Sequence, residues 1–379
     1  MSCSSLTDVK IQGAVDTLGS FCFYGCRSLT DITLPSSLTS LGDNCFGGCI
    51  SLTSLTIPDS VTSLDDNCFY NCTGLKSITL PPSLTSLEDY CFINCYSLTD
   101  ITLPSFLTAL GKYCFGYCSS LGSITIPSSV TSLGYSCFSG CSGLTDITFE
   151  GVPTIIGGDV LYGCSSLSTA NIPIGSYNSF TGNDIDESLK ETVLTLDGQG
   201  YSTICSITDL NFEGTDVTAY TAKIDDSKEF VTLSKTTQAA AGEGLVVNAE
   251  EAGTYVIPVA TSELTNSTNN DLKGVKSTDE QPEIDPSGNY YALRSYTDGT
   301  VAFAKITSTL TFPRGKAYIQ LSGTSAANKL AVNFGTATGI RNVTAEDETE
   351  GDFYNLSGVR VQNPTKGLYI RNGKKVFVK

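Results

Sequence analysis

The stretch that decides the fold is residues 91–118, CFINCYSLTDITLPSFLTALGKYCFGYC, which contains the motif Cys-Phe-x-x-Cys twice, 23 residues apart. The motif recurs with the same period through the first half of the 379-residue chain. Its six copies begin at Cys22, Cys45, Cys68, Cys91, Cys114 and Cys137. A fixed period of this length indicates an array of similar supersecondary units.

Leucines and prolines keep the same period as the cysteines. A leucine follows the second cysteine of each unit, at Leu29, Leu52, Leu75, Leu98, Leu121, Leu144 and Leu167. A proline ends each apolar run, at Pro35, Pro58, Pro81, Pro104, Pro127 and, after the degenerate unit with Glu150, at Pro173. One unit cannot close a core, but parallel stacking of neighbours buries a continuous apolar interior. The first half is therefore predicted to be a right-handed solenoid of 23-residue repeats.

Each unit combines a strand with a tighter segment. The residues from Leu29 to Leu34 alternate between inward and outward positions as in a β-strand, and the proline after them stops the pairing. Cys22 and Phe23 fall where a short helical turn is expected on the convex side. The phenylalanines of the motif are expected to stack as an internal column, at Phe23, Phe46, Phe69, Phe92, Phe115 and Phe138.

The outward strand positions form the candidate binding surface, on what is expected to be the concave sheet. One position is threonine in every full unit, and the position two residues before it varies between aspartate and serine. Residues that vary at equivalent positions of a regular backbone are typical of binding surfaces. Threonine, however, also stabilises an exposed sheet without binding a ligand. The candidates are Asp31, Thr33, Ser54, Thr56, Ser77, Thr79, Asp100, Thr102, Ser123, Thr125, Asp146 and Thr148. A second row, Thr39, Thr62, Thr85, Thr108 and Thr131, is expected on the outer side.

The cysteines are predicted to be buried free thiols that pack as small apolar groups. All of the 15 cysteines except Cys205 belong to the repeat. Side chains at i and i+4 of one helical turn are too far apart for a disulfide, although bridges between neighbouring coils remain geometrically possible. Zinc favours Cys-x-x-Cys pairs or histidine partners, and neither occurs. We therefore expect no metal site and no cofactor.

Composition excludes several classes of function. A net charge of −17 and a pI near 4.3 disfavour nucleic acid, whose phosphates require lysine and arginine. The absence of histidine removes the commonest general base, and we expect no enzymatic activity. No run of 18 apolar residues occurs, so no membrane span is predicted.

The period ends after Pro173, and a different architecture is expected beyond it. Short apolar runs separated by turn-forming residues, from Val193–Leu196 to Ala317–Leu321, favour an antiparallel β-sandwich. Asn372-Gly373, between two short apolar runs, predicts a hairpin within a small carboxyl-terminal β-meander. The expected domains are a solenoid at 1–180, a β-sandwich-like domain at 189–337 and a β module at 340–379.

Acidic clusters offer weaker signals. The loops at 184–188 and 279–285 suggest calcium, but the first lacks the glycine and distal glutamate of an EF-hand. The pairs Asp65-Asp66 and Asp225-Asp226 resemble glycosidase acids only superficially, because adjacent carboxylates on a strand point to opposite faces. Neither signal changes the expectation of a protein without metal or catalysis.

The repeat, with Cys-Phe-x-x-Cys-x-x-Leu-x-x-Ile-x-Leu-Pro as its pattern, resembles the BspA-like class of bacterial leucine-rich repeats over Cys3 to Pro173. It departs from the class by cysteine at Cys22 and its equivalents, where alanine is common. The segment from Tyr354 to Val376 is similar to the carboxyl-terminal sorting module of secreted Bacteroidetes proteins. The resemblance implies export, surface display and adhesion to proteins or glycans.

Two functions remain open at this stage. The first is a secreted or cell-surface adhesin whose concave face contacts an extracellular protein or glycan, and the second is a spacer that presents the carboxyl-terminal β domain. Because Cys3 is already in register with Cys26 and no signal peptide precedes it, we expect further repeats and a signal peptide upstream.

Overall fold

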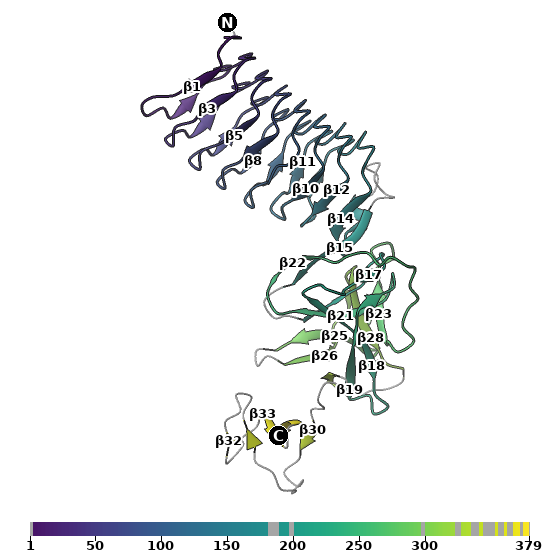
Figure 1. Ribbon diagram of the computed structural model, residues 1–379. Coiled ribbons are helices and arrows are strands. Elements are labelled where there is room, and N and C mark those ends of the chain that lie inside the picture. The colour runs from purple at the N-terminus through teal and green to yellow at the C-terminus, as the bar shows by residue number, and fades with distance from the viewer. Residues whose placement is uncertain are drawn as a thin grey trace. The chain divides into compact units, whose positions relative to one another are not determined.

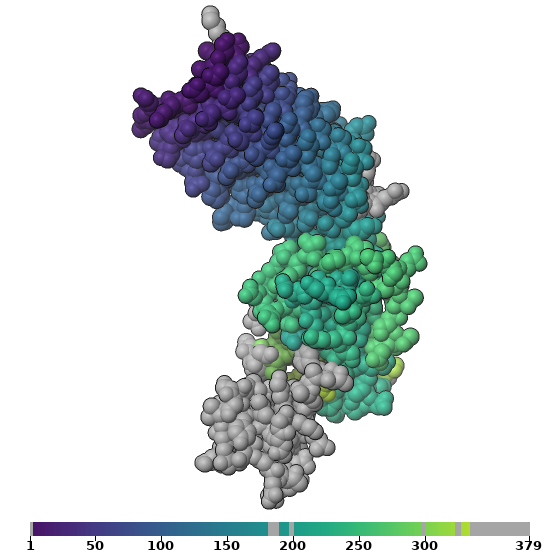
Figure 2. Space-filling model, in the orientation of Figure 1, coloured from purple at the N-terminus to yellow at the C-terminus, as the bar shows by residue number. Residues whose placement is uncertain are grey.

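The computed structural model describes residues 3–180, 189–196, 201–296, 300–322 and 327–334, and the backbone of five short strands between residues 341 and 378. The chain forms two compact units, which are drawn in space-filling form in Figure 2. The first comprises Met1–Thr195 with Thr254–Val256, and the second comprises Leu196–Gly253 with Ile257–Lys379. Each unit is described by itself.

The first unit is a β-solenoid of about eight turns, as the period predicts (Figure 1). Short strands of successive coils lie in two parallel ladders, and paired residues are 23 positions apart, as in Ser54 with Ser77 and Ser40 with Ser63. Each ladder consists of more than one hydrogen-bonded sheet, with interruptions between the strands at 31–33 and 54–56 and between those at 63–64 and 86–87. The first ladder contains β1 (Asp8–Lys10), β3 (Asp31–Thr33), β5 (Ser54–Thr56), β7 (Ser77–Thr79), β10 (Ser123–Ile126), β12 (Asp146–Phe149) and β14 (Thr169–Pro173). The second contains β2 (Thr17–Leu18), β4 (Ser40–Leu41), β6 (Ser63–Leu64), β8 (Ser86–Leu87), β9 (Ala109–Leu110), β11 (Ser132–Leu133) and β13 (Ile155–Ile156).

The carboxyl-terminal end of the first ladder is extended by two strands outside the repeat. β15 (Leu189–Leu196) pairs in parallel with β14, with a register shift between Ile172 and Pro173. Thr254–Val256, from β22 (Gly253–Val256), lies beyond β15 in the same sheet. The buried Glu191 accepts a hydrogen bond from the backbone N–H of Tyr177, the first residue of helix α1 (Tyr177–Phe180). These elements cover the sheet edge that the last repeat otherwise exposes.

The segment that carries the Cys-Phe-x-x-Cys motif is a chain of hydrogen-bonded turns rather than the short helical turn that the sequence predicts. Two positions per coil have positive φ, for example Asn67 at 57° and Asn71 at 56°, so a continuous helix cannot form. Coils are tied together here by backbone bonds such as Phe69 N–H to the Cys91 carbonyl, at 2.9 Å. The turns therefore carry a third line of contacts along the solenoid.

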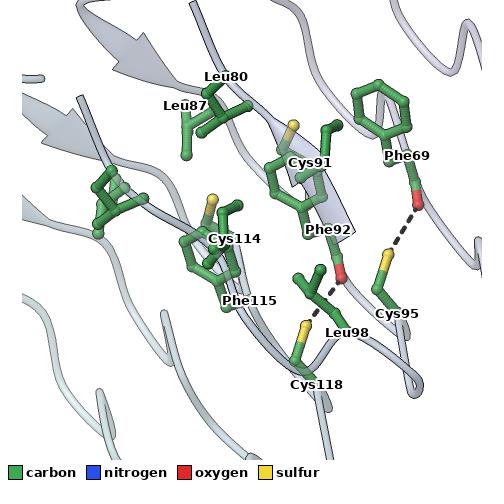
Figure 3. Close-up of a cluster of buried hydrophobic side chains, with 14 of the residues drawn as sticks. Phe69, Leu80, Leu87, Cys91, Phe92, Cys95, Leu98, Cys114, Phe115 and Cys118 are labelled. Carbon is green, nitrogen blue, oxygen red and sulfur yellow. Dashed lines mark hydrogen bonds between the residues drawn. The ribbon is translucent and has the colours of Figure 1, made fainter. Parts of the chain in front are cut away.

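The interior of the solenoid contains the predicted phenylalanine column. Neighbouring rings from Phe23 to Phe138 stack with centroids 5.3–5.4 Å apart. Beside the column, the thiol of Cys95 donates to the Phe69 carbonyl at 3.3 Å, and equivalent bonds repeat in neighbouring coils (Figure 3). Each of these carbonyls also accepts a backbone N–H, as Phe69 does from Cys72 at 3.2 Å, so the thiol is its second donor inside the core.

The second unit contains one nine-stranded sheet, in the order β16-β21-β18-β19-β29-β26-β25-β28-β23. Its strands are β16 (Tyr201–Ile204), β18 (Val217–Ile224), β19 (Phe230–Thr236), β21 (Leu245–Ala249), β23 (Leu272–Val275), β25 (Tyr290–Ser295), β26 (Val301–Lys305), β28 (Lys316–Gln320) and β29 (Lys329–Phe334). Two small sheets pair β17 (Leu210–Asn211) with β20 (Gln238–Ala239) and β24 (Glu283–Ile284) with β27 (Leu310–Thr311). The fully buried Tyr291, Phe303 and Leu330 belong to its core.

This sheet is not purely antiparallel, because β19 and β29 pair in parallel. Parallel neighbours need a long connection, and here more than ninety residues separate the two strands. The β-rich class is confirmed, whereas the two-sheet sandwich and the domain limits at 180, 189 and 337 stay predictions.

The last part of the chain forms a five-stranded sheet, β30-β34-β33-β31-β32. Its strands are β30 (Arg341–Val343), β31 (Phe353–Tyr354), β32 (Arg360–Val361), β33 (Gly367–Arg371) and β34 (Lys374–Val378). β33 and β34 pair antiparallel with Arg371 opposite Lys374, so the predicted hairpin is confirmed, while its Asn372-Gly373 turn lies outside the described residues. The sorting role suggested by resemblance stays a prediction.

Replacing Phe92 by alanine removes a fully buried ring that stacks on both sides. We expect the free energy of unfolding to fall by about 3–5 kcal/mol, the usual range for a buried aromatic residue, in urea denaturation followed by circular dichroism. The matched control is Phe106→Ala, because Phe106 is 69% exposed, and we expect a change within about 0.5 kcal/mol. Equal losses in the two variants would contradict the role of the column.

Candidate binding site

All twelve candidate residues lie on one face of the first ladder. Ten are exposed, and only Asp146 and Thr148, on β12, are partly buried. In each strand the residue between the two candidates points into the core, as Leu55 does between Ser54 and Thr56. The alternation inferred from the sequence therefore places these side chains side by side, and we call this surface the first-ladder face.

The threonine column of this face ends in a chain of side-chain hydrogen bonds. The Asn171 amide donates to the Thr148 hydroxyl at 3.2 Å, and the Thr192 hydroxyl donates to the Asn171 amide oxygen at 2.8 Å. These bonds explain the partial burial of Thr148. This end of the column is structural, whereas the hydroxyls of the earlier coils remain exposed.

The face is hollowed between the coils that contain Asp100 and Ser123. The hollow has a volume of about 330 Å³, and four of the candidates, Asp100, Thr102, Ser123 and Thr125, are among its lining residues. Strand pairing in the first ladder is interrupted here, since Asp100 makes only an isolated bridge to Ser77 and no strand is assigned at 101–103. The hydrogen bond from Gly122 N–H to the Thr99 carbonyl spans 3.5 Å, against 2.8 Å for the bond from Thr145 N–H to the Gly122 carbonyl. A wider step between coils thus accompanies the hollow.

Glu150 lines the same hollow and was not among the candidates. It takes the position that proline takes in the neighbouring coils, at Pro104 and Pro127. In the sequence, Glu150 is the single exception to the proline period, and it marked its unit as degenerate. This exception did not indicate where the Glu150 side chain lies. With Asp100, it gives the hollow two carboxylates and no cationic lining residue.

The second threonine row is engaged in holding coils together. The hydroxyls of Thr39, Thr108 and Thr131 donate to carbonyls of the preceding coil, at 2.9, 2.9 and 3.3 Å. These side chains are exposed, but their hydroxyls already have partners. These three threonines therefore stabilise the solenoid by joining neighbouring coils.

The acidic clusters do not assemble a metal site in the described residues. Asp225 accepts hydrogen bonds from the backbone N–H groups of Glu229 and Phe230, so it organises its own turn. Burial, followed by the nearby Asp43, raises the pKa of the Asp65 carboxyl. In the described part of the chain no three Cys, Asp or Glu side chains are placed to hold a metal ion, and the loop at 184–188 lies outside it. Within the same residues, no helix is long and apolar enough to cross a membrane.

The cysteines are free thiols, as predicted, and most are shielded from solvent. Twelve are buried, Cys164 is partly buried, and Cys3 and Cys22 are exposed. Burial raises the pKa of the Cys49 thiol to about 12 and that of Cys118 to about 12. Since the thiolate is the nucleophile, the buried cysteines are chemically inert in the folded protein.

Comparison with known proteins places the repeat among bacterial relatives. The family model for the BspA type leucine rich repeat region matches residues 1–122 and 108–221, in six copies. A leucine-rich repeat protein of T. pallidum is 29% identical, over 42% of this chain and 77% of its own, with a TM-score of 0.39. A leucine-rich repeat protein from Bacteroides ovatus ATCC 8483 is 28% identical, over 45% of this chain and 56% of its own, with a TM-score of 0.31.

A leucine rich cell surface protein from Faecalibacterium prausnitzii A2-165 is 23% identical, over 39% of this chain and 61% of its own, with a TM-score of 0.27. The chain thus covers less than two thirds of the Bacteroides and Faecalibacterium proteins. No curated protein matches the chain.

Thiol reactivity tests the arrangement of the cysteines. With Ellman's reagent at pH 8, we expect the two exposed thiols to react fast, Cys164 more slowly, and the twelve buried thiols only as the protein unfolds. Burial makes the pKa of the eleven buried thiols of the repeat higher in the folded than in the unfolded protein, where it is about 8.5. The stability they contribute is therefore complete below about pH 8.5 and is lost as the pH rises toward the folded value. Fast reaction of most thiols at pH 8 would show that the described core is wrong.

Proposed function

The chain belongs to the BspA-type leucine-rich repeat family, and from this membership we propose that it is a secreted or cell-surface binding protein whose first-ladder face contacts an extracellular protein or glycan. The observation that carries the proposal is the row of ten exposed polar side chains on one face, with the hollow at Asp100 and Ser123 in its middle. Polar side chains that vary from coil to coil on a regular backbone, with a hollow among them, are suited to ligand recognition.

The proposal includes an extracellular location, which rests on the resemblance to exported and surface-displayed proteins. It assigns no catalytic role, because repeat proteins of this family are typically not enzymes, and because Asp225 and Asp66 accept backbone hydrogen bonds within the fold. It also keeps the three predicted domains, with the solenoid as the binding part and the last β module in sorting.

The test is binding of the purified full chain to arrays of immobilised extracellular proteins and glycans, followed by variants of the first-ladder face. In Ser77→Trp a bulky ring is added on the exposed side of β7. We expect binding to the identified ligand to weaken about tenfold or more, equivalent to about 1.4 kcal/mol, because the ring separates the two surfaces.

The matched control is Thr62→Trp, which adds the same ring at an exposed position beside the second ladder. We expect this variant to bind like the unmodified protein. If only Thr62→Trp lost binding, the binding site would not lie on the first-ladder face. If neither the variants nor the unmodified protein bound any ligand, the result would favour the spacer role.

A further inference from the structure

A second hollow lies on the turn segments of the solenoid, away from the first-ladder face. Its volume is about 280 Å³, and it spans the three coils that contain Tyr24, Gly48 and Tyr70. None of its described lining residues is acidic, although the chain carries a net charge of −17. The hollow is thus chemically distinct from the surface around it.

Two adjacent glycines leave the middle coil of the hollow without side chains at positions 47 and 48. Gly47 occupies the position that Tyr24 and Tyr70 occupy in the coils on either side, so the middle coil contributes no ring to this row. The Tyr24 ring leans over Gly47, since a Cβ there would come within 2.9 Å of the ring atom Cδ2. Gly48 forms part of the floor with a φ of +73°.

Backbone groups of the floor are already used within the solenoid. Gly48 N–H donates to the Tyr70 carbonyl at 2.7 Å, and Gly25 N–H donates to the Gly47 carbonyl at 2.7 Å. The floor is therefore fixed, and any ligand has to be recognised by the side chains of the walls.

These side chains form a set suited to one type of ligand. Arg27 is the only arginine among the first 293 residues. Within the described part of the chain, its guanidinium and the Asn71 amide have no hydrogen-bond or ion-pair partner. A guanidinium pairs with carboxylates through two parallel hydrogen bonds, and an amide both donates to and accepts from hydroxyls. Tyr24 is 43% exposed and is held edge-on to Phe21, with ring centroids 5.5 Å apart, so its ring is preset for an apolar contact.

We propose that this hollow binds a carboxylate-bearing sugar residue of a glycan. Arg27 holds the carboxylate, the Asn71 amide binds ring hydroxyls, and the carbon face of the sugar packs against Tyr24, Tyr70 and Ile50. The volume is near the lower end of the range for small-molecule sites, about 300–1,000 Å³, and fits one sugar ring rather than a long segment. This site does not depend on the first-ladder face, and either can exist without the other.

The probes are sialyllactose and trigalacturonic acid as two sources of the carboxylate, with lactose and galactotriose as their neutral counterparts. Binding to the full chain is measured by saturation-transfer NMR and isothermal titration calorimetry. We expect at least one acidic sugar to bind at least tenfold more tightly than its neutral counterpart, because only the acidic sugar pairs with Arg27. A glutamate-rich peptide serves as an anionic control and is expected not to bind, since it lacks the sugar ring.

Two variants change the hollow without a large cost to folding. Arg27→Ser introduces the residue that later coils have at this position, Ser119 and Ser142. Gly48→Asn introduces the residue of the next two coils, Asn71 and Asn94, which also have positive φ, and its Cβ meets only Gly25, at 3.7 Å. We expect each variant to lower the affinity for the acidic sugar at least tenfold, the first by loss of charge and the second by filling the floor.

The matched controls are Lys76→Thr, which removes a positive charge elsewhere, and Gly163→Asn, which makes the same exchange at a φ of +75° in a distant coil. Both are expected to bind like the unmodified protein. The proposal would be overturned if acidic and neutral sugars bound equally well, or if the peptide bound as tightly as the acidic sugar. It would also be overturned if the control variants lost as much affinity as the test variants, or if no sugar bound at all.

Discussion

The structure of the first unit depends on one constraint, the 23-residue register in which each coil hydrogen-bonds to the next. Strand partners such as Ser54 and Ser77, and turn partners such as Phe69 and Cys91, obey this register along separate lines of the solenoid. The stacked phenylalanines and the thiol bonds to their carbonyls follow from it, because equivalent atoms fall at equivalent places. Most contacts of a coil are therefore with its two neighbours, as in other solenoids.

The same register explains how surfaces with particular chemistry arise. Since every coil supplies one residue to each row, a single exchange alters the surface without disturbing the core. Glu150 in a proline position adds a carboxylate to one hollow, and Arg27, where later coils have serine, adds a guanidinium to the other. In both hollows the buried residues fix the position of the backbone, and the exposed residues determine which chemical groups line the surface.

Much of the first unit could be predicted from the sequence because its signal is repeated. The buried column, the free thiols and the outward alternation of the candidate residues each follow from residues that recur every 23 positions. The hollows could not be predicted, because they depend on small differences between coils, such as the 3.5 Å bond at Gly122. The strands of the second unit do not repeat in the sequence, so no period could indicate that β19 pairs in parallel with β29. That pairing is set by contacts between residues far apart in the chain.

The dependence of the solenoid on the 23-residue register is tested by comparing two deletions in thermal unfolding followed by circular dichroism. Removing residues 68–90 takes out one whole repeat, whereas removing 69–90 takes out one residue fewer and shifts every later coil against its neighbour. We predict that the first deletion keeps the β signal and cooperative unfolding, with a modestly lower Tm, and that the second loses both. Similar unfolding of the two proteins would contradict this dependence.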